Sequence, residues 1–289
     1  MNTFIKAAEC WIPSPDQPLL EFGGGIFGLH RNFESISQRL CFGMGEGLPG
    51  QAWEQRRPIL LKDFDDQHFR RGAAAKSAGF QCAVALPCYQ GDRLKSVLVL
   101  YCGDTSGLPS GLELWGNDPR ITSDLTLRDA SYGRDAQNLE PEAKDTYLPR
   151  GTGLPGIAWQ RDAVVYMADL AASPRFLRGE SAAQAGLQTG LAIPVATEGA
   201  QAFVLTILSA KQTPIARRME GWVLKDGKLQ CELAQGEPLF LASAATLIQQ
   251  AWDDGVPRFA HGEEGVSASM VAIPLLADGA VSEVLVLYC

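Results

Sequence analysis

Two aspartates and two arginines occupy matching places in two separate stretches of the chain. Asp63 and Asp169 each come after an apolar, strand-like run, and Arg71 and Arg178 each lie between a Phe and a Gly. An aspartate here can orient a ligand amine or hydroxyl, or it can cap the next turn by accepting backbone N–H bonds. An arginine can clamp a carboxylate or phosphate, pair with the neighbouring aspartate, or stay solvated.

Aromatic, hydroxyl and thiol side chains accompany these charged residues. We expect Phe69 and Phe176 to pack a helix onto a sheet or to wall a pocket. Cys82 aligns with Thr189, and Cys88 lies nearby in sequence. Thiol chemistry needs a lowered thiol pKa, but no Arg, Lys or His is adjacent to either cysteine, which favours a packing role.

Composition narrows the classes of partner and compartment. The chain has 289 residues, 46% hydrophobic and 20% charged, with a net charge of −8 and no run of Lys and Arg. Nucleic acid and anionic membranes are therefore not expected as partners. No apolar stretch approaches the roughly 18 residues of a membrane helix, and no signal peptide is expected. The seven cysteines include no C-x-x-C, and the three histidines are far apart. This pattern indicates reduced thiols in a cytoplasmic protein without a metal site.

The tryptophans reveal a threefold internal repeat. The first Trp of each pair belongs to an E-x-W motif, and the second follows an Ala. The motifs are Glu9-Cys-Trp11, Glu113-Leu-Trp115 and Glu220-Gly-Trp222, with Ala-Trp at Trp53, Trp159 and Trp252. We expect both tryptophans of a pair to lie in the core, and the indole N–H of each E-x-W Trp to be hydrogen-bonded.

Each repeat closes with a predicted β-hairpin. A short apolar strand ends in Pro87, Pro194 or Pro274, and a polar turn leads to a second apolar strand. The spacing from the proline to the end of the second strand is the same in all three repeats, which indicates one hairpin register. These strands are apolar throughout, which is typical of central strands buried on both faces.

The repeats set the expected domains: residues 1–103, 111–210 and 215–289, joined by a few turn residues. We therefore expect no long helix between repeats. We expect the sheets to follow one another compactly, with the shortened third repeat packed on a neighbour. The pattern predicts an α+β fold with several antiparallel sheets of short strands and flanking helices.

The first two repeats resemble the GAF domain family. The shared features are Gly45-Glu-Gly-Leu-Pro-Gly-Gln-Ala-Trp53 and Gly151-Thr-Gly-Leu-Pro-Gly-Ile-Ala-Trp159, the following Asp, the Phe-x-Arg-Gly segment, the Ala-Gly and the hairpin. The third repeat keeps only the E-x-W, Ala-Trp and hairpin features. The resemblance implies an antiparallel sheet with helices and a small-molecule pocket beneath a lid, in a sensory or regulatory module.

The lid would comprise residues 45–79 in the first repeat and 151–186 in the second, so we expect any ligand to bind there. Its Gly-Leu-Pro-Gly could cradle an anion, but we interpret it as a tight turn before the Ala-Trp segment. The candidate ligand-binding residues are Asp63, Phe69, Arg71, Cys82, Asp169, Phe176, Arg178 and Thr189.

Three functions stay open at this point, and no cofactor is assigned. The first is a non-catalytic ligand sensor in signal transduction. The second is an interaction scaffold with vestigial pockets. The third is an enzyme like the GAF branch that reduces free methionine sulfoxide with pocket cysteines. The expected partners are a small molecule and either a signalling protein or a second copy of the chain. The cyclic-nucleotide pattern of the family and a bilin-attaching Cys-His pair are absent from the sequence.

Overall fold

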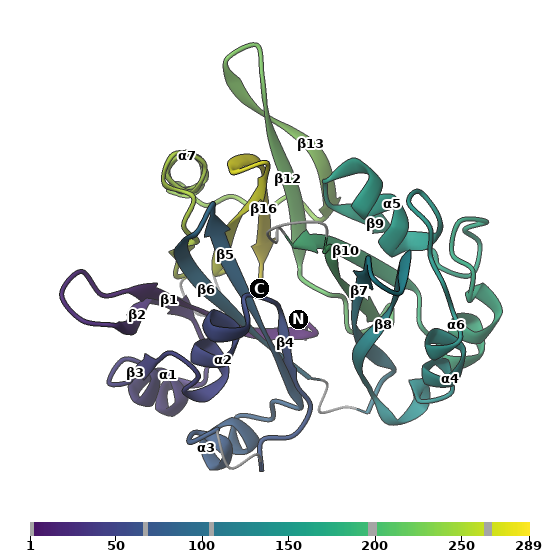
Figure 1. Ribbon diagram of the computed structural model, residues 1–289, viewed down its shortest axis with the longest axis horizontal. Helices are drawn as coiled ribbons and strands as arrows, with labels where there is room; N and C mark the ends of the chain where they lie inside the picture. Colours follow the sequence, from purple (N-terminus) through teal and green to yellow (C-terminus); the bar gives the residue numbers. More distant parts are fainter. Residues whose placement is uncertain (1–2, 66–68, 104–106, 196–200, 263–267) are drawn as a thin grey trace. The chain divides into compact units, whose positions relative to one another are not determined.

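Three antiparallel sheets form the fold of the described residues (Figure 1). The computed structural model describes residues 3–65, 69–103, 107–195, 201–262 and 268–289. We call each sheet with its helices a module. The α+β class and the repeated GAF-like organisation predicted from the sequence are confirmed. The domain boundaries given above stay a prediction.

The first module has six strands in the order β3-β2-β1-β6-β5-β4. Its helices pack over the sheet face that carries Trp11 and Tyr101. The strands are β1 (Ile5–Pro13), β2 (Leu19–Ile26), β3 (Cys41–Gly43), β4 (Ile59–Leu61), β5 (Cys82–Gln90) and β6 (Arg93–Cys102). The helices are α1 (Arg31–Ser37), α2 (Gly47–Gln55) and α3 (Gly72–Ser77).

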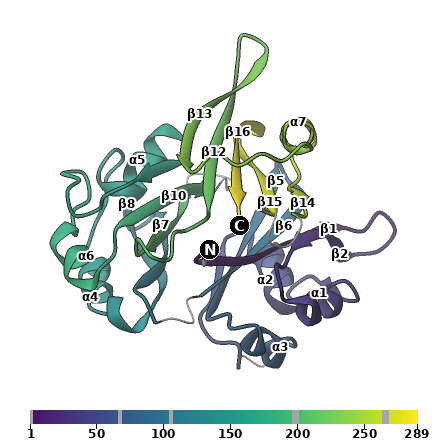
Figure 2. The ribbon, with the colours of Figure 1, turned by 180° about the vertical axis from the view of Figure 1, so that it is seen from behind.

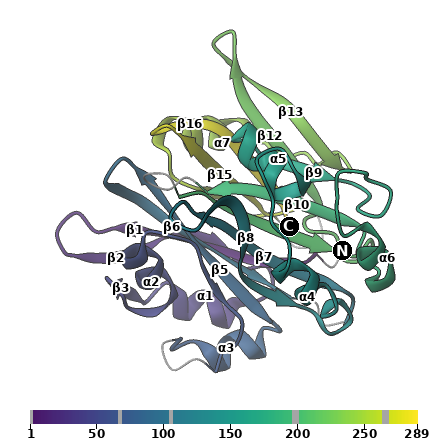
Figure 3. The same cartoon turned by 45° about the vertical axis from the view of Figure 1, so that its right-hand side comes forward.

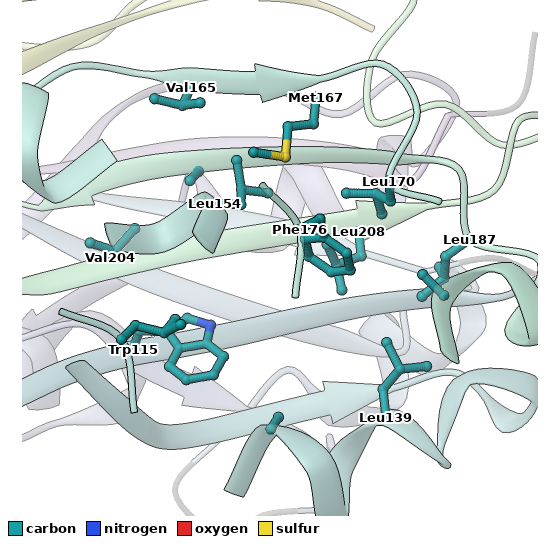
Figure 4. Close-up of a cluster of buried hydrophobic side chains, with 14 of the residues drawn as sticks. Trp115, Leu139, Leu154, Val165, Met167, Leu170, Phe176, Leu187, Val204 and Leu208 are labelled. Carbon is teal, nitrogen blue, oxygen red and sulfur yellow. The ribbon is translucent and has the colours of Figure 1, made fainter. Parts of the chain in front are cut away.

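The second module has five strands in the order β8-β7-β11-β10-β9 (Figure 3). Its strands are β7 (Ser110–Asp118), β8 (Thr122–Tyr132), β9 (Val165–Met167), β10 (Thr189–Val195) and β11 (Phe203–Ser209). Its helices are η1 (Arg134–Ala136), α4 (Leu139–Lys144), α5 (Gly153–Arg161) and α6 (Gly179–Ala185). Figure 4 shows its core, in which Leu170 and Phe176 of the lid pack with Leu208 of the sheet.

The third module repeats this order as β13-β12-β16-β15-β14, with one helix. Its elements are β12 (Arg218–Lys225), β13 (Lys228–Gly236), α7 (Ala244–Asp254), β14 (Arg258–Ala260), β15 (Met270–Ala277) and β16 (Ala280–Tyr288). Figure 2 shows α7 beside β14 and β15. Ile248 and Ala251 of α7 pack on Met270 and Val286 of the sheet, so this one helix takes the place of the lid.

The chain divides into two compact units, and each consists of two separate segments. The first unit comprises Met1–Phe4 and Gly103–Ile215, and the second comprises Ile5–Cys102 and Ala216–Cys289. The third module therefore packs on the first, with β14 and β15 in contact with β2 and β5. The longest helix of the described residues is α7, with 11 residues, so no long helix joins modules in that part of the chain.

The hairpin register agrees with the spacing argument. In all three modules the proline faces a valine of the second strand: Pro87 and Val97, Pro194 and Val204, Pro274 and Val284. The turn of the second hairpin, residues 196–200, lies outside the described residues. The second strands are buried on both faces, as their apolar sequence predicts.

The Gly-Leu-Pro-Gly segments are helical, so our interpretation of them as turns was wrong. They form the first turns of α2 and α5, where a proline is tolerated because the first N–H groups of a helix have no intrahelical partner. A Cβ on Gly50 would lie 2.1 Å from the carbonyl oxygen of Gly43, and one on Gly156 would lie 2.5 Å from that of Pro149. The second glycine of each segment therefore permits close contact between the helix and the preceding loop.

None of the helices within the described residues is both long enough and apolar enough to cross a membrane.

Candidate functional site

The E-x-W motif builds a buried charged cluster in the first module. Glu9 and Trp11 lie two residues apart on β1 and face the same side, and the indole Nε1 of Trp11 donates to Glu9 Oε1 at 2.9 Å. Arg71 donates from Nη1 to Glu9 Oε2 at 2.8 Å and from Nη2 to Glu9 Oε1 at 2.7 Å. The Tyr101 hydroxyl donates to Glu9 Oε1 at 2.6 Å.

The contacts within this cluster stabilise the charged forms of Glu9 and Arg71. Burial alone raises the pKa of Glu9, but the charge of Arg71 and hydrogen bonds from Arg71, Tyr101 and Trp11 outweigh it, so the pKa lies below its ordinary value. The guanidinium of Arg71 also donates to Ser37 Oγ at 2.5 Å and lies 4.8 Å from the ring centre of Phe33. This fully paired arginine is only 3% exposed.

The second module repeats the cluster with one change. Arg178 donates to both carboxylate oxygens of Glu113, at 2.7 and 2.8 Å, and Trp115 Nε1 donates to Glu113 at 2.9 Å. The hydroxyl comes from Tyr132 on β8 and lies 2.5 Å from Glu113 Oε1. Burial alone raises the pKa of Glu113, but Arg178 and the hydrogen bonds again bring it below its ordinary value.

The third module keeps the motif without a lid arginine. Trp222 Nε1 donates to Glu220 Oε2 at 2.9 Å, and Arg218 of the same strand donates from Nε to Glu220 Oε1 at 2.5 Å. All three E-x-W indoles are thus hydrogen-bonded as predicted. The prediction that both tryptophans of each pair lie in the core was wrong in part, because Trp53, Trp159 and Trp252 are half-buried, as is Trp222.

Arg71 and Arg178 therefore have a partner that the sequence reasoning missed. We weighed a ligand contact, the neighbouring aspartate or solvent, but each arginine binds the glutamate of its own E-x-W motif. The signal that could identify this partner is the glutamate of the E-x-W motif, which recurs in all three repeats. Each arginine therefore pairs with this glutamate and not with the aspartate near it in sequence. Asp63 and Asp169 are exposed.

The two aspartates make turn-capping bonds. Asp63 Oδ1 accepts the backbone N–H of Asp65 at 2.9 Å, and Asp169 Oδ1 accepts that of Ala172 at 2.9 Å. These bonds are of the capping kind considered from the sequence. Asp63 also lies 3.9 Å from Lys76 Nζ.

The remaining candidates lie in the packed interior or between strands. Phe69 and Phe176 are buried in the cores of their modules, so their rings fill space between lid and sheet. Figure 4 shows Phe176. Cys82 is buried on β5 with Sγ 4.0 Å from the carbonyl oxygen of Cys102. The Thr189 and Ser209 hydroxyls are 2.8 Å apart across β10 and β11.

Burial suppresses thiol reactivity in the first module. It raises the pKa of Cys10 and of Cys88 to about 12. The pKa of Cys102 also rises well above its ordinary value through burial. Because the thiolate is the nucleophile, these cysteines are poor nucleophiles at neutral pH. Within the described residues, no three His, Cys, Asp or Glu side chains gather as a metal site.

An open hollow lies on the lid of the second module, between α5, β9 and the segment that follows β9. We call it the α5–β9 hollow, and it consists of two adjoining cavities of about 410 and 310 Å³ that share Ile157, Arg161 and Arg175. The larger is also lined by Gly151, Thr152, Gly153, Gln160, Pro174 and Leu177. The smaller is also lined by Val165, Tyr166, Met167, Ala168, Asp169 and Ser173.

The hollow contains one of the eight predicted site residues, Asp169. Sequence reasoning missed Arg161 and Arg175, because they have no arginine counterpart in the first repeat: Gln55 and His68 stand at the matching places. His68 lies outside the described residues.

Comparisons with known proteins fit this architecture. Residues 5–113 match the family described as GAF domain, and no curated protein matches the chain. Similar solved structures include a free methionine-R-sulfoxide reductase from Neisseria meningitidis in complex with its substrate (15% identity, 34% of this chain and 52% of that chain, TM-score 0.27). Others are the GAF domain of a phosphoenolpyruvate-protein phosphotransferase from Coxiella burnetii (20%, 34% and 56%, 0.27) and the A. aeolicus nlh2 GAF domain in an inactive state (15%, 35% and 59%, 0.28).

The alignments span little more than half of those three chains. Within this chain, the second and third sheets repeat the strand order of β2-β1-β6-β5-β4 and the hydrogen-bonded E-x-W motif of the matched segment. The chain therefore consists of repeated GAF-like modules, and the segment that holds its first module matches the GAF domain family.

Proposed function

We propose that this chain is a non-catalytic sensory or regulatory protein whose second module binds a small molecule in the α5–β9 hollow. The observation that carries the proposal is the composition of the hollow. Its walls come from the lid, and they combine apolar residues such as Ile157 and Met167 with polar residues such as Tyr166 and Asp169. Concave sites that combine apolar walls with a few polar groups are typical of ligand pockets.

The environment of the reactive groups supports a non-catalytic role. The buried carboxylates of Glu9 and Glu113 are each paired with an arginine, which leaves them no proton to exchange near neutral pH. The raised pKa values of Cys10 and Cys88 argue against a thiol mechanism of the sulfoxide-reductase kind. A thiol-dependent turnover assay with free methionine sulfoxide should therefore give no product.

A second candidate function is an interaction scaffold, and the first module favours it. The space between its lid and sheet is packed with rings, including Phe33 and Phe69 around Arg71. An interior filled in this way leaves no room for a ligand beside Arg71. We therefore assign ligand binding to the second module and a structural role to the first.

A thermal-shift screen of small molecules against the full chain tests this proposal, because a ligand that binds only the folded state raises the melting temperature. Two exposed alanines of one segment give matched variants. Ala168 lines the hollow and Ala171 does not. Ala168→Trp should remove the shift caused by a hit, and Ala171→Trp should keep it. A screen without hits, or hits that Ala168→Trp leaves unchanged, would favour the scaffold.

A further inference from the structure

We propose that the α5–β9 hollow is an anion site, which takes a small molecule bearing a carboxylate or phosphate group. This inference rests on the proposed function, since it names the ligand class of the same hollow. The larger cavity has two charged lining residues, and both are arginines: Arg161 of α5 and Arg175 of the segment after β9. The only acid of the hollow is Asp169, in the smaller cavity.

Within the described residues, Arg161 and Arg175 differ from the paired arginines in having no acidic partner. Arg71, Arg178 and Arg218 each pair with a glutamate. Arg161 and Arg175 form no ion pair within the part of the chain that the structure describes, and both are exposed. Because these two arginines come from different elements and line one cavity, an anion bound there could be contacted by both. The planar guanidinium also matches the geometry of carboxylate and phosphate oxygens.

The first module shows what a carboxylate does at the corresponding place. Glu46 precedes α2 as Thr152 precedes α5, and its carboxylate accepts the Gly43 N–H at 3.1 Å and pairs with Arg70 at 2.9 Å. The first module therefore supplies its own anion beside an arginine. In the second module Thr152 carries a neutral hydroxyl and Leu177 replaces the Arg70 counterpart, so this place is open to an external anion.

The smaller cavity limits the charge that the ligand can carry. The smaller cavity is also lined by Tyr166, Met167 and Asp169. Asp169 would repel a second anionic group of the ligand. We therefore place the anionic group in the larger cavity, and an uncharged or hydrogen-bond-donating part of the ligand in the smaller one. Such a ligand is a small organic acid or phosphate ester rather than a polyanionic chain.

Titration of the full chain with inorganic phosphate and, separately, succinate tests this inference, with sodium chloride used to hold the ionic strength constant. Backbone ¹H–¹⁵N spectra should show saturable shifts at Gly151 and Gly153, which line the larger cavity. Arg161→Gln and Arg175→Gln should each weaken the binding at least tenfold. Arg39→Gln changes an exposed arginine of the first module and should leave the affinity unchanged. A response to phosphate alone or to succinate alone identifies which anion the site takes.

A further variant separates loss of folding from loss of the site. Thr152→Glu places in the second module the residue that the first module has, so the chain should fold and its own carboxylate should compete with the added anion. Anion binding that persists in Thr152→Glu and in both arginine variants would overturn the inference, as would the absence of any saturable shift. If phosphate and succinate fail but a neutral compound from the screen binds in an Ala168→Trp-sensitive way, the anion inference falls and the proposed function stands.

Discussion

Arg178 and Glu113 face each other in the buried centre of the second module, with Nη1 2.7 Å from Oε1 and Nη2 2.8 Å from Oε2. The two residues come from the start of α6 and from β7, so this bidentate pair ties the lid to the sheet. Arg71 and Glu9 do the same in the first module. Arg71 and Arg178, which the sequence suggests as ligand-binding residues, therefore anchor the lid to the sheet.

Removal of one partner of this pair should strongly destabilise the second module. Arg178→Met leaves the Glu113 carboxylate buried without its counter-charge, and such a change typically costs about 3–5 kcal/mol of unfolding free energy. Urea denaturation followed by tryptophan fluorescence measures this loss.

The double variant Arg178→Met, Glu113→Met is the control for that experiment. Replacing both charges by apolar groups removes the unpaired charge, so the double variant should be more stable than Arg178→Met alone. If the losses of the single variants Arg178→Met and Glu113→Met simply add in the double variant, the pair does not act as a unit. The interpretation of Arg178 as a lid anchor would then be wrong.

The same pair predicts a pH dependence of stability. The pKa of Glu113 is lower in the folded protein than its ordinary value of 4.5. Its contribution is therefore present above about pH 4.5 and is lost as the pH falls from there through the lower folded pKa. Glu113→Gln lacks this contribution at every pH. Melting temperatures of the native chain and of Glu113→Gln should differ most at neutral pH and should converge as the pH drops below 4.5. A difference that stays constant down to pH 3 would contradict this assignment.

The repeat, the hairpins and the indole hydrogen bonds could be predicted from the sequence because each depends on residues close together in the chain. Glu9 and Trp11 are neighbours on one face of one strand, and Pro87 meets Val97 across a short turn. The period-two geometry of a strand and the register of a hairpin determine such contacts locally.

The partner of Glu9 could not be predicted in this way, because Arg71 comes from 62 residues away. An arginine and an aspartate close in sequence suggested a pair, but burial decides the pairing: Glu9 is inaccessible to solvent and needs a counter-charge, and exposed Asp63 does not. The packing of the third module on the first was unspecified for a similar reason. Strands that are apolar on both faces indicate that a face is covered, but not by which sheet.

The close contact at Gly156 predicts the sign of a mutational effect. In an exposed helix interior, Gly→Ala stabilises by roughly 0.5–1 kcal/mol. At Gly156 the added Cβ would lie 2.5 Å from the backbone carbonyl oxygen of Pro149, which cannot swing away as a side chain could. Gly156→Ala should therefore lower the unfolding free energy measured in urea. A stabilised variant would show that the loop before α5 moves freely.

The two tryptophans of the second module should differ in how much they contribute to the unfolding free energy. Trp115 is inaccessible to solvent and hydrogen-bonded to Glu113, so Trp115→Ala should cost about 3–5 kcal/mol as a core truncation. Trp159 is half-buried, with the guanidinium of Arg150 4.8 Å from its ring centre, so Trp159→Ala should cost clearly less. Denaturant unfolding of the two variants compares them directly. Equal losses would mean that Trp159 is a core residue of the second module after all.

The compact unit that contains the first and third modules predicts that the second module can be removed. Ile5–Cys102 and Ala216–Cys289 form one compact unit, and every strand of the first and third sheets pairs within its own sheet. Among the described residues, no strand of Gly103–Ile215 pairs with a strand of these two sheets. A chain in which a flexible Gly/Ser linker replaces that segment should therefore keep its β-sheet circular dichroism and unfold cooperatively on heating. As a matched control, Phe259→Ala in the same shortened chain should lower the melting temperature, because Phe259 packs against Gly24 of the first module. If the shortened chain shows no cooperative transition, the first and third modules require the second in order to fold.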